Sequence, residues 1–158
     1  MPDVHFVSFA SRRLAGSLAR IRAEAAALGR FRSIHALTPR GLGRDYWAVH
    51  AETVRGQRRG YGLWTWKPYV VRRVLNEIPT DDVLVYCDAG CSLNVEGVPR
   101  LDAYAGLAAG HPAQMLAFTL DQPVGEWTKR ATLQAAAASD EVRARPMVSA
   151  TALVVRSS

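Results

Sequence analysis

The apolar run at residues 83–87, VLVYC, constrains the fold of this chain more than any other segment. It is rich in β-branched residues and contains no charged residue, which is the pattern of a strand buried on both faces. Strands of that kind belong to parallel sheets that are covered by helices on both sides. The run leads directly to Asp88 and a loop of small residues. Because open α/β sheets bind ligands at the carboxyl ends of their strands, the sequence predicts an α/β fold with Asp88 at a ligand site.

A helix is predicted immediately before this strand. Pro68 suits a first helical turn, where its missing N–H is not needed, and Pro79 ends the helix. Between them, apolar residues recur at helical spacing and give one buried face: Val70, Val71, Val74, Leu75 and Ile78. Asp81 and Asp82 follow as a turn, which places this carboxylate pair at the opposite edge of the sheet from Asp88.

The rest of the chain alternates strands and helices in the same way. Ser11 is placed to cap a helix, and Gly29 is placed to end it in the left-handed conformation. The resulting β-α-β unit implies a right-handed crossover and parallel strands. We therefore predict one domain over residues 1–158, an α/β fold with a mostly parallel sheet flanked by helices. The remaining predicted strands are residues 4–10, 31–37, 114–120 and 148–155, and the remaining predicted helices are residues 12–28, 45–54, 98–109 and 126–138.

Composition narrows the class of protein. Apolar residues make up 49% of the 158 residues and charged residues 22%, which are ordinary globular values. The chain has 20 Lys and Arg and 14 Asp and Glu, which gives a net charge of +6. This charge fits either an anionic partner or a solvated basic surface. No stretch has the roughly 20 apolar residues of a membrane span, and residues 1–10 read as a strand rather than a signal peptide, so we expect a cytoplasmic protein.

Several kinds of site are not indicated. Cys87 and Cys91 have neither zinc spacing nor a disulfide framework, and Cys87 is expected to be a small core residue. The four histidines show no ligand spacing and are expected to be structural. No Walker loop, no GxGxxG after the first strand and no Ser-His-Asp arrangement is visible, which argues against an NTPase, a dinucleotide dehydrogenase and a hydrolase.

Two sequence blocks carry a family resemblance. Residues 60–69 read GYGLWTWKPY and residues 83–94 read VLVYCDAGCSLN. Together they resemble bacterial sugar transferases of the GT-A type, which have a nucleotide-diphosphate-sugar transferase fold. The resemblance extends over residues 4–156. It implies transfer of a sugar from a nucleotide-diphosphate donor, expected to be a UDP-sugar, onto a glycan acceptor of the cell surface or capsule, with peripheral membrane association. Relatives continue further, so the acceptor-binding part is expected to be shortened at the C-terminus.

The resemblance assigns Asp88 to catalysis and to a metal. GT-A enzymes place an Asp-x-Asp motif here, whose carboxylates hold a divalent cation against the donor's diphosphate. In this chain the motif is Asp88-Ala89-Gly90, so the second carboxylate is absent. Magnesium often takes one or two carboxylates plus phosphates, which leaves Mn²⁺ or Mg²⁺ as the expected cofactor. The alternatives are that Asp88 binds a ribose or sugar hydroxyl, or that it is an ordinary turn residue.

Further residues are expected to bind the donor. Trp64 and Trp66 offer aromatic faces for a sugar or base, although one of them is expected to fill the core, and Lys67 suits a phosphate. In the resembled fold the corner after the first strand holds base and ribose. Arginines at the start of the following helix oppose the helix dipole and hint at an anionic ligand. The residues assigned to this corner are Ser8, Ala10 and Arg13.

A second block, Trp127-Thr128-Lys129-Arg130, resembles a family segment in which an Asp follows. Here Ala131 stands in its place. Asp121 is assigned to donor binding, and Glu126 is assigned to catalysis as a carboxylate beside the sugar, with a turn or helix-start role as the alternative for both. Lys129 and Arg130 are assigned to phosphates or are solvated.

Two rival functions stay open. The missing second carboxylate and Ala131 favour a domain that binds nucleotide sugars without transferring them. The net charge alone suggests a nucleic-acid binder, whose affinity would weaken log-linearly with salt. The basic residues are scattered over several predicted helices, so we do not expect nucleic acid as a partner.

Overall fold

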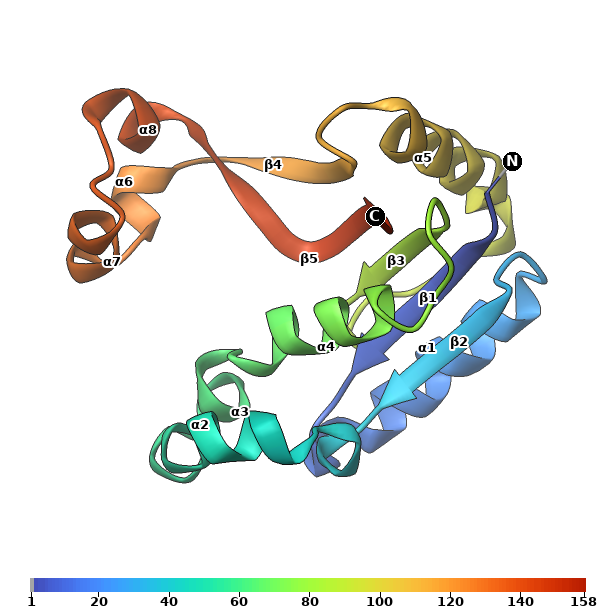
Figure 1. Ribbon diagram of the computed structural model, residues 1–158, viewed down its shortest axis with the longest axis horizontal. Coiled ribbons are helices and arrows are strands. Elements are labelled where there is room, and N and C mark those ends of the chain that lie inside the picture. The colour runs from blue at the N-terminus through green and yellow to red at the C-terminus, as the bar shows by residue number, and fades with distance from the viewer. Residues whose placement is uncertain (1) are drawn as a thin grey trace.

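The computed structural model describes residues 2–158, which form one five-stranded sheet with helices on both faces (Figure 1). The strand order is β2-β1-β3-β5-β4. The strands are β1 (Val4–Phe9), β2 (Ser33–Leu37), β3 (Val83–Cys87), β4 (Met115–Pro123) and β5 (Pro146–Arg156). The helices are α1 (Ala15–Ala27), α2 (Arg44–Gly56), α3 (Gly60–Leu63), α4 (Trp66–Leu75), α5 (Val98–Gly110), α6 (Val124–Trp127), α7 (Arg130–Ala135) and α8 (Asp140–Ala144).

The sheet is mixed. Strand β1 pairs in parallel with β2 on one side and with β3 on the other, as the β-α-β pattern predicts. Strand β5 pairs antiparallel with both β3 and β4, so of the strands in residues 2–158 it alone runs against the others. The prediction of a mostly parallel sheet therefore holds for strand direction, but two of the pairings are antiparallel. Consecutive strands β4 and β5 pair directly, and direct neighbours of this kind pair antiparallel.

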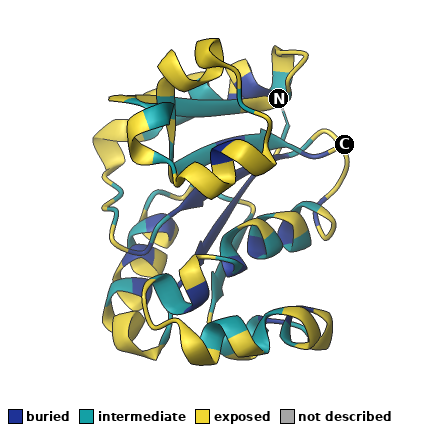
Figure 2. Cartoon of the chain, turned by 90° about the vertical axis from the view of Figure 1, so that its left-hand side faces the viewer, coloured by how far each residue is buried: buried dark blue, intermediate teal, exposed yellow. Residues whose placement is uncertain are grey.

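Two apolar clusters cover the two faces of the sheet. On one face Val4 and Phe6 pack against Leu18 and Ile21 of α1, with α5 alongside. On the other face alternate residues of β1 and β3 pack against α2 and α4, including Val7, Phe9, Tyr46, Trp66, Val70 and Val74. Every residue of β1 and β3 is buried, which confirms that these strands are covered on both sides (Figure 2).

The outer part of the β4–β5 pair extends away from the other strands (Figure 1). We call residues 119–148 the arm. It carries α6, α7 and α8, of which α6 and α8 contact each other. Figure 2 shows mostly exposed residues in this part, in contrast to the buried strands at the centre.

The predicted helix over residues 126–138 is wrong, because two short helices lie there. Thr128 and Lys129 have extended ψ angles of 135° and separate α6 from α7. Along this segment Leu133 is the buried residue of α7, so no continuous apolar face holds a longer helix against the body. Helix α8 was not predicted, although Ser139 caps it by accepting a hydrogen bond from the N–H of Val142 at 3.3 Å.

The start of α1 also differs from the prediction. A 3₁₀ turn at Arg12–Leu14 precedes the α-helix, and the Ser11 side chain makes no capping hydrogen bond. Gly29 has a φ of 61°, and its N–H donates to the carbonyl of Ala26, so it ends the helix as predicted.

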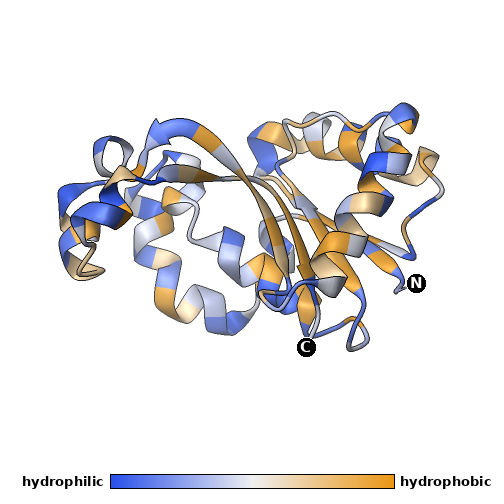
Figure 3. Cartoon of the chain, turned by 90° about the horizontal axis from the view of Figure 1, so that it is seen from above, coloured by the Kyte–Doolittle hydropathy of each residue, from blue (hydrophilic) through white to orange (hydrophobic). Residues whose placement is uncertain are grey.

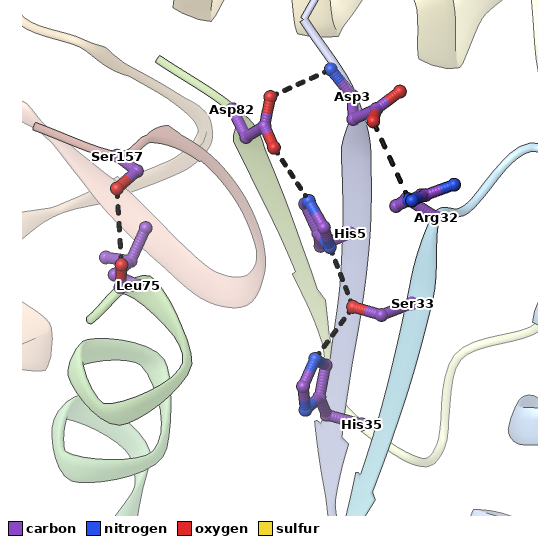
Figure 4. Close-up of polar contacts among 8 residues, drawn as sticks. All are labelled: Asp3, His5, Arg32, Ser33, His35, Leu75, Asp82 and Ser157. Carbon is purple, nitrogen blue, oxygen red and sulfur yellow. Dashed lines mark hydrogen bonds and ion pairs between the residues drawn. The ribbon is translucent and has the colours of Figure 1, made fainter. Parts of the chain in front are cut away.

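A polar chain closes the amino edge of the parallel strands (Figure 4). Asp82 Oδ2 lies 3.1 Å from Nε2 of the buried His5, whose Nδ1 lies 2.7 Å from Ser33 Oγ. Ser33 Oγ is also 2.8 Å from Nε2 of His35. An Asp-His-Ser chain therefore exists that the sequence did not reveal. Because both ring nitrogens of His5 are bonded within the sheet, the chain satisfies buried polar groups, as expected for structural histidines.

Candidate functional site

An ion pair between Lys67 and Asp88 lies at the carboxyl edge of the parallel strands. Lys67 Nζ is 2.8 Å from Asp88 Oδ1 and also donates to the carbonyl of Ala150 at 2.8 Å. The Lys67 side chain is only 12% exposed, whereas the Asp88 side chain is 34% exposed. The ammonium thus connects the start of α4, the end of β3 and the strand β5. The two sequence blocks that predict these residues meet at this pair.

Tyr86 contacts both members of the Lys67–Asp88 pair. Its hydroxyl donates to the same Oδ1 of Asp88, and its ring lies 5.1 Å from Lys67 Nζ. Burial raises the pKa of the Tyr86 hydroxyl, with a further contribution from its hydrogen bond to Asp88. The phenol therefore stays protonated and remains a donor. Asp88 is held by an ammonium and a hydroxyl on Oδ1, and Oδ2 makes no hydrogen bond or ion pair within residues 2–158, so this oxygen of the partly exposed carboxylate is available to a ligand.

The glycine-aromatic block before Lys67 forms a left-handed turn. The φ angles of Gly60, Tyr61, Gly62, Leu63 and Trp64 are all positive, between 52° and 83°. Each non-glycine residue in this region costs about 1–2 kcal/mol. Side chains from just beyond the turn hold it in place, because Trp66 Nε1 donates to the carbonyl of Gly60 and Thr65 Oγ1 donates to that of Gly62, both at 2.9 Å.

Trp66 and Trp64 differ in their surroundings. Trp66 is buried and stacks on Phe9 with ring centroids 4.3 Å apart, so it offers a ligand almost no surface and belongs to the core. Trp64 is 43% exposed, and the guanidinium of Arg59 lies 5.7 Å from its ring. Of the two tryptophans, Trp64 is the one with a face that a ligand can reach.

The loop after Asp88 is clamped to α1 by a charged pair. Arg20 donates to the carbonyls of Ala89 and Cys91, at 3.1 and 2.8 Å, and pairs with Glu24 at 2.6 Å. Glu24 in turn accepts the N–H of Leu93 at 2.8 Å. This N–H, followed by the Arg20 side chain, lowers the pKa of Glu24. The clamp holds residues 89–93 against α1.

A pocket of about 580 Å³ opens at the carboxyl ends of β1 and β2. Three arginines line it, Arg12, Arg13 and Arg40, and none of their guanidinium groups makes a hydrogen bond or ion pair within residues 2–158. Unpaired guanidinium groups around a hollow favour an anion with several oxygens. The ring of Tyr61, from the left-handed turn, lines the same pocket. We call this hollow the arginine pocket.

The arginine pocket and the ion pair share one edge of the sheet. Val7 of β1 pairs with Tyr86 of β3, so Asp88 stands level with Phe9 on the neighbouring strand. The pocket lining begins at the next residue, Ala10. Adjacent strands are about 4.8 Å apart, so an extended ligand at this edge can contact both features.

The donor set at Asp88 does not fit a cation held by the protein. Within residues 2–158, no three His, Cys, Asp or Glu side chains gather closely enough to bind a metal ion. Asp88 itself is paired with an ammonium, whose charge opposes a second cation at the same carboxylate. Lys67 already supplies a positive charge at this position.

The other predicted site residues are dispersed. Ala10 and Arg13 line the arginine pocket. Ser8 lies inside β1, fully buried, and its hydroxyl has no hydrogen-bond partner among residues 2–158. Four predicted residues lie on the arm and make no hydrogen bond or ion pair with Lys67 or Asp88: Asp121, Glu126, Lys129 and Arg130. Trp127, beside them, is 65% exposed.

Sequence reasoning missed several residues that shape the site. Arg20 lies on the exposed side of α1, where the sequence pattern indicates a solvated residue, and Arg40 lies between the predicted strand at 31–37 and the predicted helix at 45–54. The signal that points to the pocket is the concentration of arginines after the first two strands. Nothing in the local pattern points to Ala150, whose backbone carbonyl binds Lys67.

The two cysteines occupy opposite environments. Cys87 belongs to the core, as predicted, while Cys91 is partly exposed and donates to the carbonyl of Thr151 at 4.0 Å. A hydrogen bond with Cys87 lowers the pKa of Cys91 to about 7, while that contact and burial raise the pKa of Cys87. Of these two thiols, Cys91 is the nucleophilic one.

Among residues 2–158, no helix combines the length and the apolar character that crossing a bilayer requires. Comparison of the chain with protein-family models, with curated proteins and with solved structures finds no match.

Proposed function

We propose that this chain binds a nucleoside diphosphate sugar at the carboxyl edge of β1 and β3 and transfers the sugar to an acceptor hydroxyl, as a transferase of the GT-A type. The observation that carries the proposal is the arginine pocket with its three unpaired guanidinium groups, next to the Lys67–Asp88 pair. Guanidinium groups bind phosphate oxygens bidentately, and a diphosphate offers enough oxygens for several of them.

The two features divide the donor between them. Arg12, Arg13 and Arg40 bind the diphosphate, and the Tyr61 ring packs on the base or ribose. The sugar then points toward Asp88, whose free Oδ2 accepts a hydrogen bond from a sugar hydroxyl. Lys67 stabilises the negative charge of the departing phosphate as a point charge.

In the transfer, an acceptor oxygen forms a bond with the anomeric carbon, and the bond from that carbon to the diphosphate oxygen breaks. The nucleoside diphosphate leaves with the bonding electrons, and the acceptor proton is lost to a base. Positioning and charge stabilisation by Lys67 and the arginines supply the catalysis that this chain's own residues provide. Because Asp88 does not fit a resident cation, we assign no step to a metal.

Calorimetric titration with UDP, GDP and CMP, and with a sugar conjugate of each, tests the proposal. One nucleotide is expected to bind with similar affinity in Mn²⁺ and in chelator. Replacement of Arg12 and Arg40 together by Gln is expected to weaken that binding by at least tenfold, because hydrogen bonds to charged groups are worth about 1.5–3 kcal/mol. Arg22→Gln, on the exposed side of α1 and outside the pocket lining, is the matched control. Absence of binding for every nucleotide would refute the proposal.

A second candidate is a domain that binds the nucleotide sugar without transferring it. Two observations favour this second candidate. Asp88 is already bonded to Lys67 and Tyr86, and within residues 2–158 no second carboxylate is bonded to this site. Release of nucleoside diphosphate from the bound donor, measured with and without an added glycan acceptor, separates the two. Binding without release supports the second candidate.

A further inference from the structure

A second hollow lies on the face of the sheet that α1 and α5 cover, opposite α4. Its volume is about 270 Å³. Val85 and Cys87 of β3 and Val154 of β5 form its floor, while Leu101 and Tyr104 of α5 form a wall. Phe118 of β4 closes it with a ring centroid 5.3 Å from that of Tyr104. We call it the α5 pocket. It is separate from the arginine pocket in position and in chemistry.

The lining of the α5 pocket is predominantly apolar. Figure 3 shows hydrophobic residues along the strands and on the helices that flank them. An apolar cavity of about 150 Å³ is enough to bind benzene. The α5 pocket is larger than that, so it has room for an apolar group of at least benzene size. Water bound there would find few polar partners.

Among the described residues that line the α5 pocket, Arg100 is the charged one. Arg100 is exposed, and its guanidinium group makes no hydrogen bond or ion pair within residues 2–158. Other charged side chains of this face are paired, since Arg20 binds Glu24 within α1, and Arg30, just beyond α1, binds Asp102 of α5. An apolar hollow with one unpaired guanidinium in its lining complements a ligand with an apolar body and a single anionic end.

We propose that the α5 pocket binds a small apolar chain or ring that carries a carboxylate, with the apolar part between α5 and the sheet and the carboxylate on Arg100. Burial of the apolar part supplies the attraction, and the guanidinium accounts for selection of the anionic end. The proposal does not depend on the proposed transferase function, because neither Lys67 nor Asp88 lines the α5 pocket, and none of the three arginines of the arginine pocket does.

Three probes test this with the whole chain: octanoate, octan-1-ol and acetate. Octanoate has both an alkyl chain and a carboxylate, octan-1-ol has the alkyl chain alone, and acetate has the carboxylate with almost no alkyl chain. Calorimetric titration is expected to give the tightest binding for octanoate, about tenfold weaker binding for octanol and no measurable binding for acetate. Equal affinity for octanoate and octanol, or no binding of either, overturns the proposal.

Two variants locate the site. Arg100→Gln is expected to weaken octanoate about tenfold and to leave octanol unchanged, whereas Arg22→Gln on α1 changes neither. Ala152→Phe fills the hollow from β5 and is expected to abolish binding of both. If that variant does not fold, Leu101→Trp fills the same space from α5. Octanoate binding that survives both Arg100→Gln and a folded filling variant overturns the assignment.

Discussion

Lys67 Nζ lies 2.8 Å from Asp88 Oδ1 and is almost enclosed, so a nearly buried ammonium is balanced by a carboxylate that still reaches solvent. The two residues come from the start of α4 and the end of β3. The enclosed ammonium depends on this carboxylate, because an unpaired buried charge is far more costly than a paired one. The pair is thus a structural element of the sheet edge as well as a candidate ligand site.

Replacing Asp88 by Asn tests both roles. The amide cannot neutralise Lys67, so we expect a loss of about 1–3 kcal/mol in the free energy of unfolding and loss of donor binding. Urea denaturation measures the first and calorimetry the second. Asp81→Asn is the matched control, because Asp81 is exposed and has a φ of 73°, which Asn tolerates. Equal stabilities for Asp88→Asn and Asp81→Asn would contradict the role given to the pair.

Tyr86→Phe removes the hydroxyl that donates to Asp88 and keeps the ring under Lys67. We expect it to cost about 1 kcal/mol at neutral pH. Because burial raises the pKa of Tyr86 in the folded state, the unfolded chain loses this proton first, and stability falls as pH rises above the ordinary value of 10.0. Between neutral and strongly alkaline pH, the free energy of unfolding should therefore fall less for Tyr86→Phe than for the original chain. Urea denaturation at several pH values measures both, and an equal fall for the two proteins would refute this.

Gly62→Ala tests the left-handed turn. Gly62 has a φ of 83°, and an added Cβ would lie 2.7 Å from Cγ2 of Val54. We expect a loss of more than about 1 kcal/mol, from the backbone conformation and the collision together. Gly106→Ala is the control, because a Cβ there, within α5, meets nothing within 4 Å. That change is expected to stabilise the chain by about 0.5–1 kcal/mol, so thermal unfolding should shift in opposite directions for the two variants.

His35→Asn tests the polar chain at the amino edge. Burial lowers the pKa of His35 from its ordinary value of 6.5. The unfolded state therefore binds the proton more readily, and stability is full above pH 6.5 and declines as pH falls below it. Asn removes this titration and should flatten the stability curve in that range. Urea unfolding at closely spaced pH values measures the slope, and an unchanged slope would exclude His35 as its source.

The thiols should react in order. With a pKa of about 7, Cys91 is expected to be alkylated by iodoacetamide at neutral pH, whereas Cys87 in the core is expected to react only after unfolding. Mass spectrometry after digestion identifies the modified residue. A Cys91→Ser variant should take up no label while folded, and rapid labelling of Cys87 in that variant would contradict the packing described for β3.

The sequence predicts those parts of the fold that have a strong periodic pattern. Strand β3 and helices α4 and α5 were located because each has a clear apolar run or stripe. The arm was not, because its helices have short apolar faces and their ends depend on local backbone geometry at Thr128 and Lys129. The position of β5, antiparallel between β3 and β4, depends on pairing with strands far away in the sequence, which no local pattern encodes.

For the site, sequence motifs pointed to Asp88 and Lys67, because a charge beside tryptophans and a carboxylate after a buried strand stand out from their surroundings. The motifs did not say that these two charges neutralise each other, or that a backbone carbonyl of β5 completes the arrangement. Such contacts join segments far apart in the chain, so they are visible only once the strand order is known.

That strand order has a consequence for biosynthesis. Strand β4 reaches the sheet only through β5, and of the five strands in residues 2–158, β5 is made last. On the ribosome, β1, β2 and β3 can pair early, but the free side of β3 stays without its neighbour until residues 146–156 emerge. We therefore expect Lys67 to gain its Ala150 partner only after residues 146–156 have emerged, so that a nascent chain acquires its ligand site well after the Lys67 and Asp88 segments themselves have been made.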